Sequence, residues 1–176
     1  MDFMVADSSS LILLAKCSLL EIVCDLFEVI VPESVNMEVA SEGLSKKYSD
    51  AVLISDLTSK GAIKVHSPGS DSLPPPISLH QGEEDALLLA IKLGKSLFAT
   101  DDGKAIKAAR YFKIPFIITP KIVVELVRMK KISFKKARES LEKLGKIGRY
   151  SPDIIADALV SLMEEKNGKA DNNKDT

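Results

Sequence analysis

The sequence predicts an α/β fold built on a mostly parallel central sheet of about four to five strands, with helices on both faces and further helices at the C-terminus. Two observations lead to this expectation. Short apolar runs that fit buried strands alternate along the chain with longer segments of helical periodicity. Polar residues that start helices come directly after such runs, as DSSS does after Phe3–Ala6.

Each element has a local reason in the sequence. The expected strands are 3–6, 29–31, 63–65, 97–100 and 116–118. The expected helices are one from near Leu11, then 18–27, 34–42, 48–59, 81–93, 104–112, one from Pro120, 133–145 and 152–165. Pro32 ends the second strand, and Gly94 stands where a helix C′ residue belongs. Ser34 and Pro120 suit the starts of helices, and residues 67–78 form a Pro/Gly/Ser loop.

The bulk properties favour a cytoplasmic protein with no membrane segment. No apolar run approaches the roughly 18 residues needed to cross a bilayer. The start of the chain, MDFMVADSSS, lacks the basic region that precedes the apolar stretch of a secretory signal. Cys17 and Cys24 match neither a redox nor a zinc spacing, so we expect reduced thiols in the core.

The net charge of −1 conceals a strong asymmetry. Residues 104–149 carry 14 Lys and Arg against 3 Asp and Glu, whereas residues 1–103 carry 7 against 16. Such a basic block is either a set of solvated helix faces or a track for a polyanion backbone, and composition does not decide between them. Lys104, Lys107 and Arg110 recur on one expected helix and are candidate phosphate contacts. The stretch KKISFKKAR, residues 130–138, is a candidate extension of that track.

Carboxylates follow two of the expected strands directly. Asp7 comes after the first strand, and Asp101 and Asp102 come after the strand over 97–100. In a parallel sheet these acids share the carboxyl edge, which is where such sheets bind ligands. Glu38 and Glu83 lie on the inward stripes of their helices by i, i+3, i+4 spacing.

Each of these acids also has a simpler explanation. Asp7 and Asp102 are good N-caps. Glu83 suits the positive end of a helix dipole, and Glu38 suits the rim of an imperfect amphipathic helix. Taken together, several ionised carboxylates at one edge need a cation to offset their repulsion, and oxygen ligands suit Mg²⁺ or Mn²⁺. The set predicts a metal site whose chemistry is phosphodiester hydrolysis.

Four segments, ADSSSLILLAK, VPESVNMEV, QGEEDALLLAIKLG and LFATDDGKAIKAA, resemble in order the four acidic motifs of the PIN-domain family. The resemblance covers residues 3 to about 127 and implies a three-layer α/β/α fold. It implies that the catalytic, metal-binding acids are Asp7, Glu38, Glu83 and Asp102. The fourth motif contains both Asp101 and Asp102, and the resemblance does not decide between them as main ligand, although Asp102 matches the commoner spacing and Asp101 is a further candidate metal ligand. Ser9 and Thr100 are expected to be supporting polar residues. The third acid of the family is often Asp, so the longer Glu83 is a departure that could displace or weaken the metal.

The resemblance also implies an activity and partners. Members of the family are largely Mg²⁺- or Mn²⁺-dependent ribonucleases, and many prokaryotic ones are VapC-type toxins of toxin–antitoxin pairs. We therefore expect an endoribonuclease that acts on RNA, with an antitoxin protein and a homodimer as further expectations. The catalytic domain is expected over 1–127, a helical extension of it over 128–165 and a disordered tail over 166–176.

Two other functions are weighed against the nuclease. A PIN-like module without catalysis would bind RNA or protein, and sequence does not measure turnover. A phosphoacceptor domain of the receiver kind resembles an acidic pair after the first strand, whereas here the pair follows a late strand. His66 and His80 have no second His at ligand spacing, and the chain has no Gly-rich nucleotide-binding motif.

Overall fold

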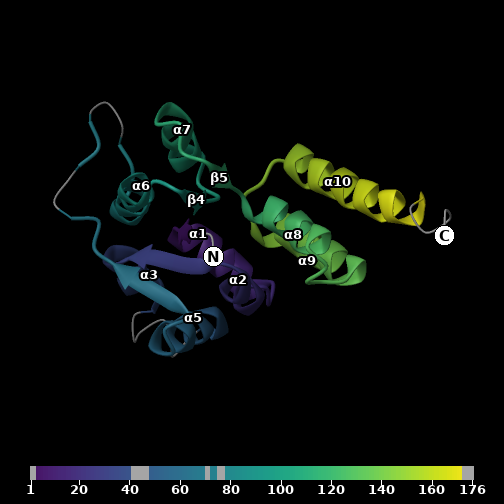
Figure 1. Ribbon diagram of the computed structural model, residues 1–176, viewed down its shortest axis with the longest axis horizontal. Helices are drawn as coiled ribbons and strands as arrows, with labels where there is room; N and C mark the ends of the chain where they lie inside the picture. The colour runs from purple at the N-terminus through teal and green to yellow at the C-terminus, as the bar shows by residue number, and fades with distance from the viewer. Residues whose placement is uncertain (1–2, 41–47, 70–71, 75–77, 172–176) are drawn as a thin grey trace. The chain divides into compact units, whose positions relative to one another are not determined.

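The structure is a computed structural model that describes residues 3–40, 48–69, 72–74 and 78–171, with backbone only for 40 and 167–171. The chain divides into two compact units, Met1–Ile118 and Thr119–Thr176. The first unit holds the sheet and its helices, and the second consists of helices (Figure 1). The division comes earlier in the chain than residue 127, where the sequence predicts that the main domain ends.

A five-stranded parallel sheet forms the centre of the first unit, in the order β3-β2-β1-β4-β5. Its strands are β1 Phe3–Ala6, β2 Glu28–Pro32, β3 Ile63–His66, β4 Ser96–Ala99 and β5 Phe116–Ile117. The helices of this unit are α1 Ser8–Lys16, α2 Leu20–Leu26, α3 Glu33–Ala40, α5 Ser49–Ser59, α6 Gln81–Leu93 and α7 Gly103–Tyr111. A helix separates each strand from the next, as parallel pairing requires. The predicted α/β class is confirmed.

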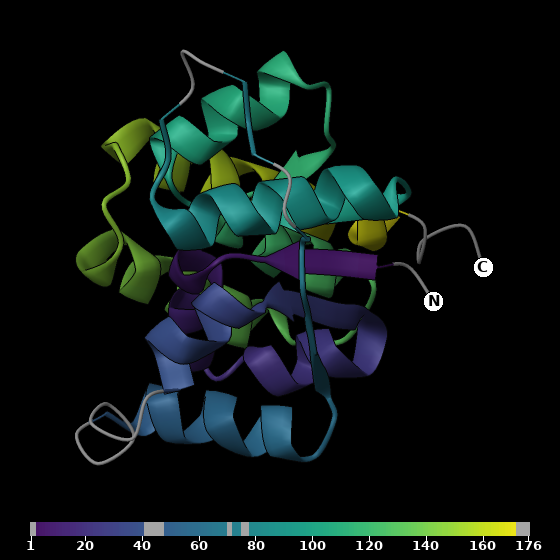
Figure 2. The same ribbon diagram turned by 90° about the vertical axis from the view of Figure 1, so that its left-hand side faces the viewer.

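Helices cover both faces of this sheet, which gives the predicted three layers. Figure 2 shows α6 on one side of β1, with α2, α3 and α5 on the other side. On the α6 face, Val5, Ile30 and Phe98 pack against small and aliphatic side chains of α6 and α7. These three residues occupy neighbouring positions in register, so alternate residues of the strands supply each face.

The order of the strands creates a switch point at the centre of the sheet. The chain leaves β1 for β2 and β3 on one side, and it returns to the other side of β1 as β4. The carboxyl ends of β1 and β4 therefore flank the place where the strand order reverses. Open parallel sheets bind their ligands at this place.

Two helix starts differ from the expected ones for identifiable reasons. Helix α1 begins at Ser8 rather than near Leu11, because the carboxylate of Asp7 accepts the backbone N–H of Ser10 at 3.0 Å and caps the helix there. Ser34 is not a cap but lies inside α3, where its hydroxyl donates to Asp85 Oδ2 at 2.5 Å. The expected end of this helix, Glu42, lies outside the described residues.

The second unit packs three helices against one another: α8 Thr119–Arg128, α9 Phe134–Ile147 and α10 Pro152–Asp171 (Figure 1). Leu126, Leu141 and Leu162 supply one buried side chain from each helix. Residues 166–171 continue α10, where the sequence predicts a disordered tail, because each residue added to a packed helix forms a further backbone hydrogen bond. Residues 172–176 lie outside the described chain. None of the helices in the described part is long and apolar enough to cross a bilayer.

In the part of the chain that the structure describes, three helices end on a residue other than glycine in the left-handed conformation: Ser18 after α1, Lys113 after α7 and Lys130 after α8. Each end carries the two bonds of a Schellman motif. After α7, for example, the N–H of Lys113 donates to Arg110 at 3.1 Å and the N–H of Ile114 donates to Ala109 at 2.8 Å. Gly61 makes the same turn after α5.

Lys113→Gly is therefore expected to raise the free energy of unfolding by about 1 kcal/mol, because the left-handed conformation costs a non-glycine residue roughly 1–2 kcal/mol, partly offset by the greater unfolded entropy of Gly. Urea denaturation followed by circular dichroism measures the change. The matched control is Lys107→Gly, an exposed position inside α7, where Gly should lower stability by about 1 kcal/mol. Changes of the same sign in both variants would contradict this account of the turn.

Candidate active site

The register of the sheet places Asp7 beside Thr100. Ala6 of β1 pairs with Ala99 of β4, so the next residue of each strand lies at the same carboxyl edge. The backbone N–H of Asp7 donates to the carbonyl of Ala99 at 3.1 Å. The hydroxyl of Thr100 donates to Asp7 Oδ2 at 2.5 Å, joining residues 93 positions apart in the sequence. The switch point thus holds a carboxylate fixed by a hydroxyl from the neighbouring strand.

Ser9 and the acidic pair extend this arrangement into a network. The Ser9 hydroxyl donates to Asp7 Oδ1 at 2.7 Å and accepts the backbone N–H of Asp101 at 3.0 Å. The hydroxyl of Thr100 accepts the backbone N–H of Asp102 at 3.2 Å. The supporting roles expected for Ser9 and Thr100 remain predictions, but both side chains contact the first predicted acid directly.

Asp7 is a buried carboxylate with an altered acidity. Only 1% of the residue is exposed. Burial raises the pKa of Asp7 from 3.8 to about 6, and the nearby charge of Asp101 adds to the rise. The hydrogen bonds from Thr100, Ser10 and Ser9 act in the opposite direction. Ionised Asp7 therefore lacks sufficient positive charge around it, which is the condition under which a carboxylate favours a nearby cation.

Asp102 caps α7 and brings its charge close to Glu83. Its Oδ1 atom accepts the N–H groups of Lys104 at 2.7 Å and Ala105 at 2.9 Å. Glu83 lies in the first turn of α6, where its Oε2 atom accepts the N–H of His80 at 3.1 Å. Partial burial raises the pKa of Glu83, the charge of Asp102 adds to the rise, and Lys104 opposes it. Glu83, Asp102 and Lys104 therefore form one electrostatic group.

Glu38 approaches the first turn of α6 at a glycine. A Cβ atom on Gly82 would lie 3.1 Å from Glu38 Oε2 and 3.2 Å from Val35 Cγ2. The Ser34–Asp85 hydrogen bond also ties α3 to α6. Sequence reasoning missed Gly82 and this bond. The signal for Gly82 was a glycine inside a helical segment, which marks a close approach.

The acids thus follow one another along the edge, but they are not assembled around one point. Asp7 neighbours Asp101, Asp102 neighbours Glu83, and Glu38 lies close to Gly82, the residue before Glu83 in the first turn of α6. In the part of the chain that the structure describes, no group of three or more Asp, Glu, His or Cys side chains is arranged so that it could hold a metal ion. The donor set itself is all oxygen, which fits Mg²⁺ or Mn²⁺. Asp102 and Glu83 accept the capping bonds described above through one oxygen each, which leaves the second out of those bonds.

The basic residues predicted to contact phosphate lie on α7, directly after Asp102. Lys104, Lys107 and Arg110 are exposed. The guanidinium of Arg110 lies 5.5 Å from the centre of the Phe116 ring. This cation–π contact limits the directions available to Arg110. Of the three, Lys104 is the one whose positive charge acts on an acid of this edge, since it lowers the pKa of Glu83.

The cysteines lie away from these acids, whereas His80 donates its backbone N–H to Glu83 Oε2. Cys17 and Cys24 are both buried in the core, as the sequence predicts, and are not joined in a disulfide. Burial raises the pKa of Cys24 to about 12, which keeps it protonated at neutral pH. His66 and His80 are both exposed.

Comparison with known proteins agrees with this architecture. No curated protein and no solved structure matches the chain significantly. A family model described as a PIN domain matches residues 3–165, which span the five-stranded sheet, the four acid-bearing segments and most of the second unit. The chain belongs to the PIN-domain family.

Proposed function

We propose that this protein is a metal-dependent endoribonuclease, in which Asp7, Glu38, Glu83 and Asp102, with Asp101 beside them, hold Mg²⁺ or Mn²⁺ at the carboxyl edge of β1 and β4. PIN domains are generally nucleases, and such nucleases typically use divalent metals. The observation that carries the proposal is the buried Asp7, fixed by Ser9 and Thr100 at the switch point, with a raised pKa.

The chain's own side chains have separate roles in this proposal. Ser9 and Thr100 orient Asp7, and the N-terminus of α7 orients Asp102. Lys104, Lys107 and Arg110 offer positive charge to the RNA backbone next to the acids. A bound divalent ion would neutralise phosphate charge and make a water molecule more acidic. Because the acids form no ready group of three in the described residues, side chains along this edge must move for three of them to share one ion.

The lack of a ready group of three acids among the described residues favours a second function, a PIN-like module that binds RNA or protein without cleaving it. Incubation of the purified protein with a mixed RNA pool separates the two functions. Cleavage that requires Mn²⁺ or Mg²⁺ and stops with chelator supports the nuclease. RNA binding without cleavage under all metal conditions supports the module. The proposal also includes a toxin role with an antitoxin partner, and a homodimer. Growth arrest on induced expression tests the toxin role, and light scattering tests the homodimer.

Metal binding at this edge has a consequence for stability. We expect Mn²⁺ to raise the unfolding temperature, because a ligand that binds only the folded state stabilises it, by about 2.7 kcal/mol at a hundredfold excess over its Kd. Asp7→Asn should lose this response. The control is Asp56→Asn on α5, whose exposed carboxylate pairs with Lys60 at 2.6 Å. An unchanged response in both Asp7→Asn and Glu83→Gln would remove the metal from this edge.

A further inference from the structure

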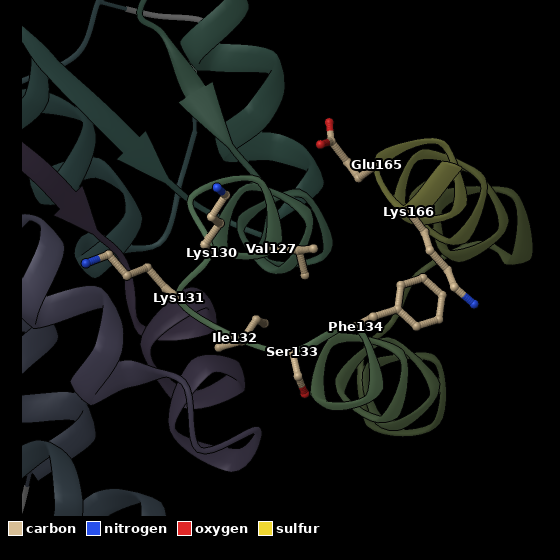
Figure 3. Close-up of a pocket in the computed structure, with 8 residues that line it drawn as sticks. All are labelled: Val127, Lys130, Lys131, Ile132, Ser133, Phe134, Glu165 and Lys166. Carbon is tan, nitrogen blue, oxygen red and sulfur yellow. The ribbon is translucent and has the colours of Figure 1, made fainter. Parts of the chain in front are cut away.

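The second unit contains a cavity of about 460 Å³ between the end of α8, the start of α9 and α10 (Figure 3). We call it the Lys130 pocket, and its lining residues are Val127, Lys130, Lys131, Ile132, Ser133, Phe134, Glu165 and Lys166. Figure 3 shows Lys130 and Lys131 on one side of it and Lys166 on the other. Its size falls in the range of small-ligand sites, which is about 300–1,000 Å³.

The turn that forms this pocket is held by its own backbone. Lys130 takes the left-handed conformation, with φ of 59°, and its N–H donates to the carbonyl of Val127 at 2.9 Å. The N–H of Lys131 donates to Leu126 at 2.8 Å. The hydroxyl of Ser133 then accepts the N–H of Lys136 at 3.1 Å and caps α9. The backbone that carries the two lysines is thus fixed before any ligand arrives, while both lysine side chains are exposed and free to adjust to a phosphate.

The charge around the pocket is strongly positive. Residues 128–138, RMKKISFKKAR, contain six Lys and Arg and no Asp or Glu. The acid that lines the pocket, Glu165, accepts a hydrogen bond from Arg128 Nε at 2.8 Å. Its charge is therefore offset within the unit. An anionic ligand fits this pocket better than a neutral or cationic one.

The remaining lining is apolar and partly aromatic. Val127 is buried, and Ile132 and Phe134 are half-buried. The Lys166 ammonium lies 4.9 Å from the centre of the Phe134 ring. Apolar side chains beside lysine ammonium groups suit a ligand that combines a flat ring with a phosphate. Unpaired nucleotides have this combination, whereas an acidic peptide offers carboxylates without the ring, and a duplex keeps its bases stacked inside.

We propose that the Lys130 pocket binds one unpaired nucleotide of a single-stranded RNA, with Lys130 and Lys131 contacting its phosphates and Ile132 and Phe134 contacting its base or sugar. The inference rests on the proposed function, because it gives the RNA substrate a second point of attachment, on the helical unit. It also assigns a use to the basic stretch that the acid-bearing edge does not explain.

Fluorescence anisotropy with a labelled, unstructured single-stranded RNA tests the proposal. Asp102→Asn serves as the parent protein, so that the RNA stays intact. The double variant Lys130→Gln/Lys131→Gln removes two of the three lysine charges that line the pocket. Gln at position 130 adds no backbone strain beyond that of the Lys it replaces, because neither residue is glycine. Lys121→Gln/Lys146→Gln removes the same charge from exposed positions of the same unit outside the pocket.

The pocket variant should bind RNA about tenfold more weakly than its parent. Its slope of log K on log salt should be shallower by about 0.7 for each phosphate that the lysines no longer neutralise. The control variant should change affinity by less than about threefold, as charges without a specific partner do. Phe134→Leu should weaken binding by about fivefold or more while leaving the salt slope unchanged, because it removes the stacking ring and no charge.

Equal reductions of affinity in the two double variants would overturn the proposal, since the lysines would then act only through net charge. Equal affinity for duplex and single-stranded RNA, no RNA binding at all, or competition by polyglutamate as strong as that by RNA would also overturn it. The outcome is separate from that of the proposed function. Binding is measured in the Asp102→Asn background, and cleavage is measured with the wild-type protein. If binding depends on the pocket but the wild-type protein does not cleave RNA, the nuclease alone is refuted. If the wild-type protein cleaves RNA with metal but binding does not depend on the pocket, the pocket proposal alone is refuted.

Discussion

Asp102→Asn is expected to lower the rate of RNA cleavage by about 100-fold or more, because the charge stabilisation organised by a metal ligand is worth several kcal/mol. The fold should persist. Asn is as good an N-cap as Asp, so its oxygen can still accept the N–H groups of Lys104 and Ala105. RNA affinity should hold or increase, since a negative charge is removed from the path of the RNA.

Single-turnover cleavage of a labelled RNA in Mn²⁺ measures this rate. Asp101→Asn is the informative comparison, because the sequence does not decide which member of the pair carries the greater role. Asp56→Asn, remote on α5, should cleave at the parental rate. If Asp102→Asn cleaves as fast as Asp56→Asn does, the fourth acid position is misassigned or the nuclease proposal is wrong.

The second large effect is a dependence of stability on pH that originates in Asp7. The folded protein holds the Asp7 proton up to a pKa of about 6, whereas the unfolded chain releases it near 3.8. Between these values the folded state binds more protons, so stability contributed by Asp7 is present at low pH and is lost as pH rises. The difference amounts to about 3 kcal/mol at neutral pH, as an order of magnitude.

Asp7→Asn should remove this dependence. In metal-free buffer at pH 7 the variant is expected to be more stable than the wild-type protein, by up to about 3 kcal/mol, and the difference should shrink as the pH falls from about 6 to about 4. Asn retains an acceptor for Ser9 and Ser10, so the cap of α1 survives. Denaturant titrations of both proteins at a series of pH values measure the difference. A variant that is less stable than wild type throughout would contradict the burial-driven pKa.

Local sequence signals predicted most of the fold. Alternating apolar runs located all five strands to within about one residue, and the acids after β1 and β4 followed from parallel pairing. The ends of α1, α7 and α8 were harder to foresee, because Ser18, Lys113 and Lys130 adopt a conformation that sequence assigns to glycine. Backbone hydrogen bonds of the Schellman motif hold that conformation, and the residue types at these positions do not signal it.

The site was predictable to a lesser extent than the fold. Order and context selected the acid-bearing segments, but they did not show how closely the side chains approach. Glu38 lies close to Gly82 of α6, where an added Cβ atom would make its neighbours shift slightly, and this approach depends on the packing of two helices from distant parts of the chain. The hydrogen bond between Ser34 and Asp85 depends on the same packing.

The position of β1 in the middle of the sheet also sets the order in which this protein folds. β1 leaves the ribosome first, yet its partner β4 and the Thr100 hydroxyl that fixes Asp7 come 93 residues later. Such distant pairing slows folding, because a long loop must close before the two strands can pair. A nascent chain therefore cannot fix Asp7 at the switch point until β4 has emerged.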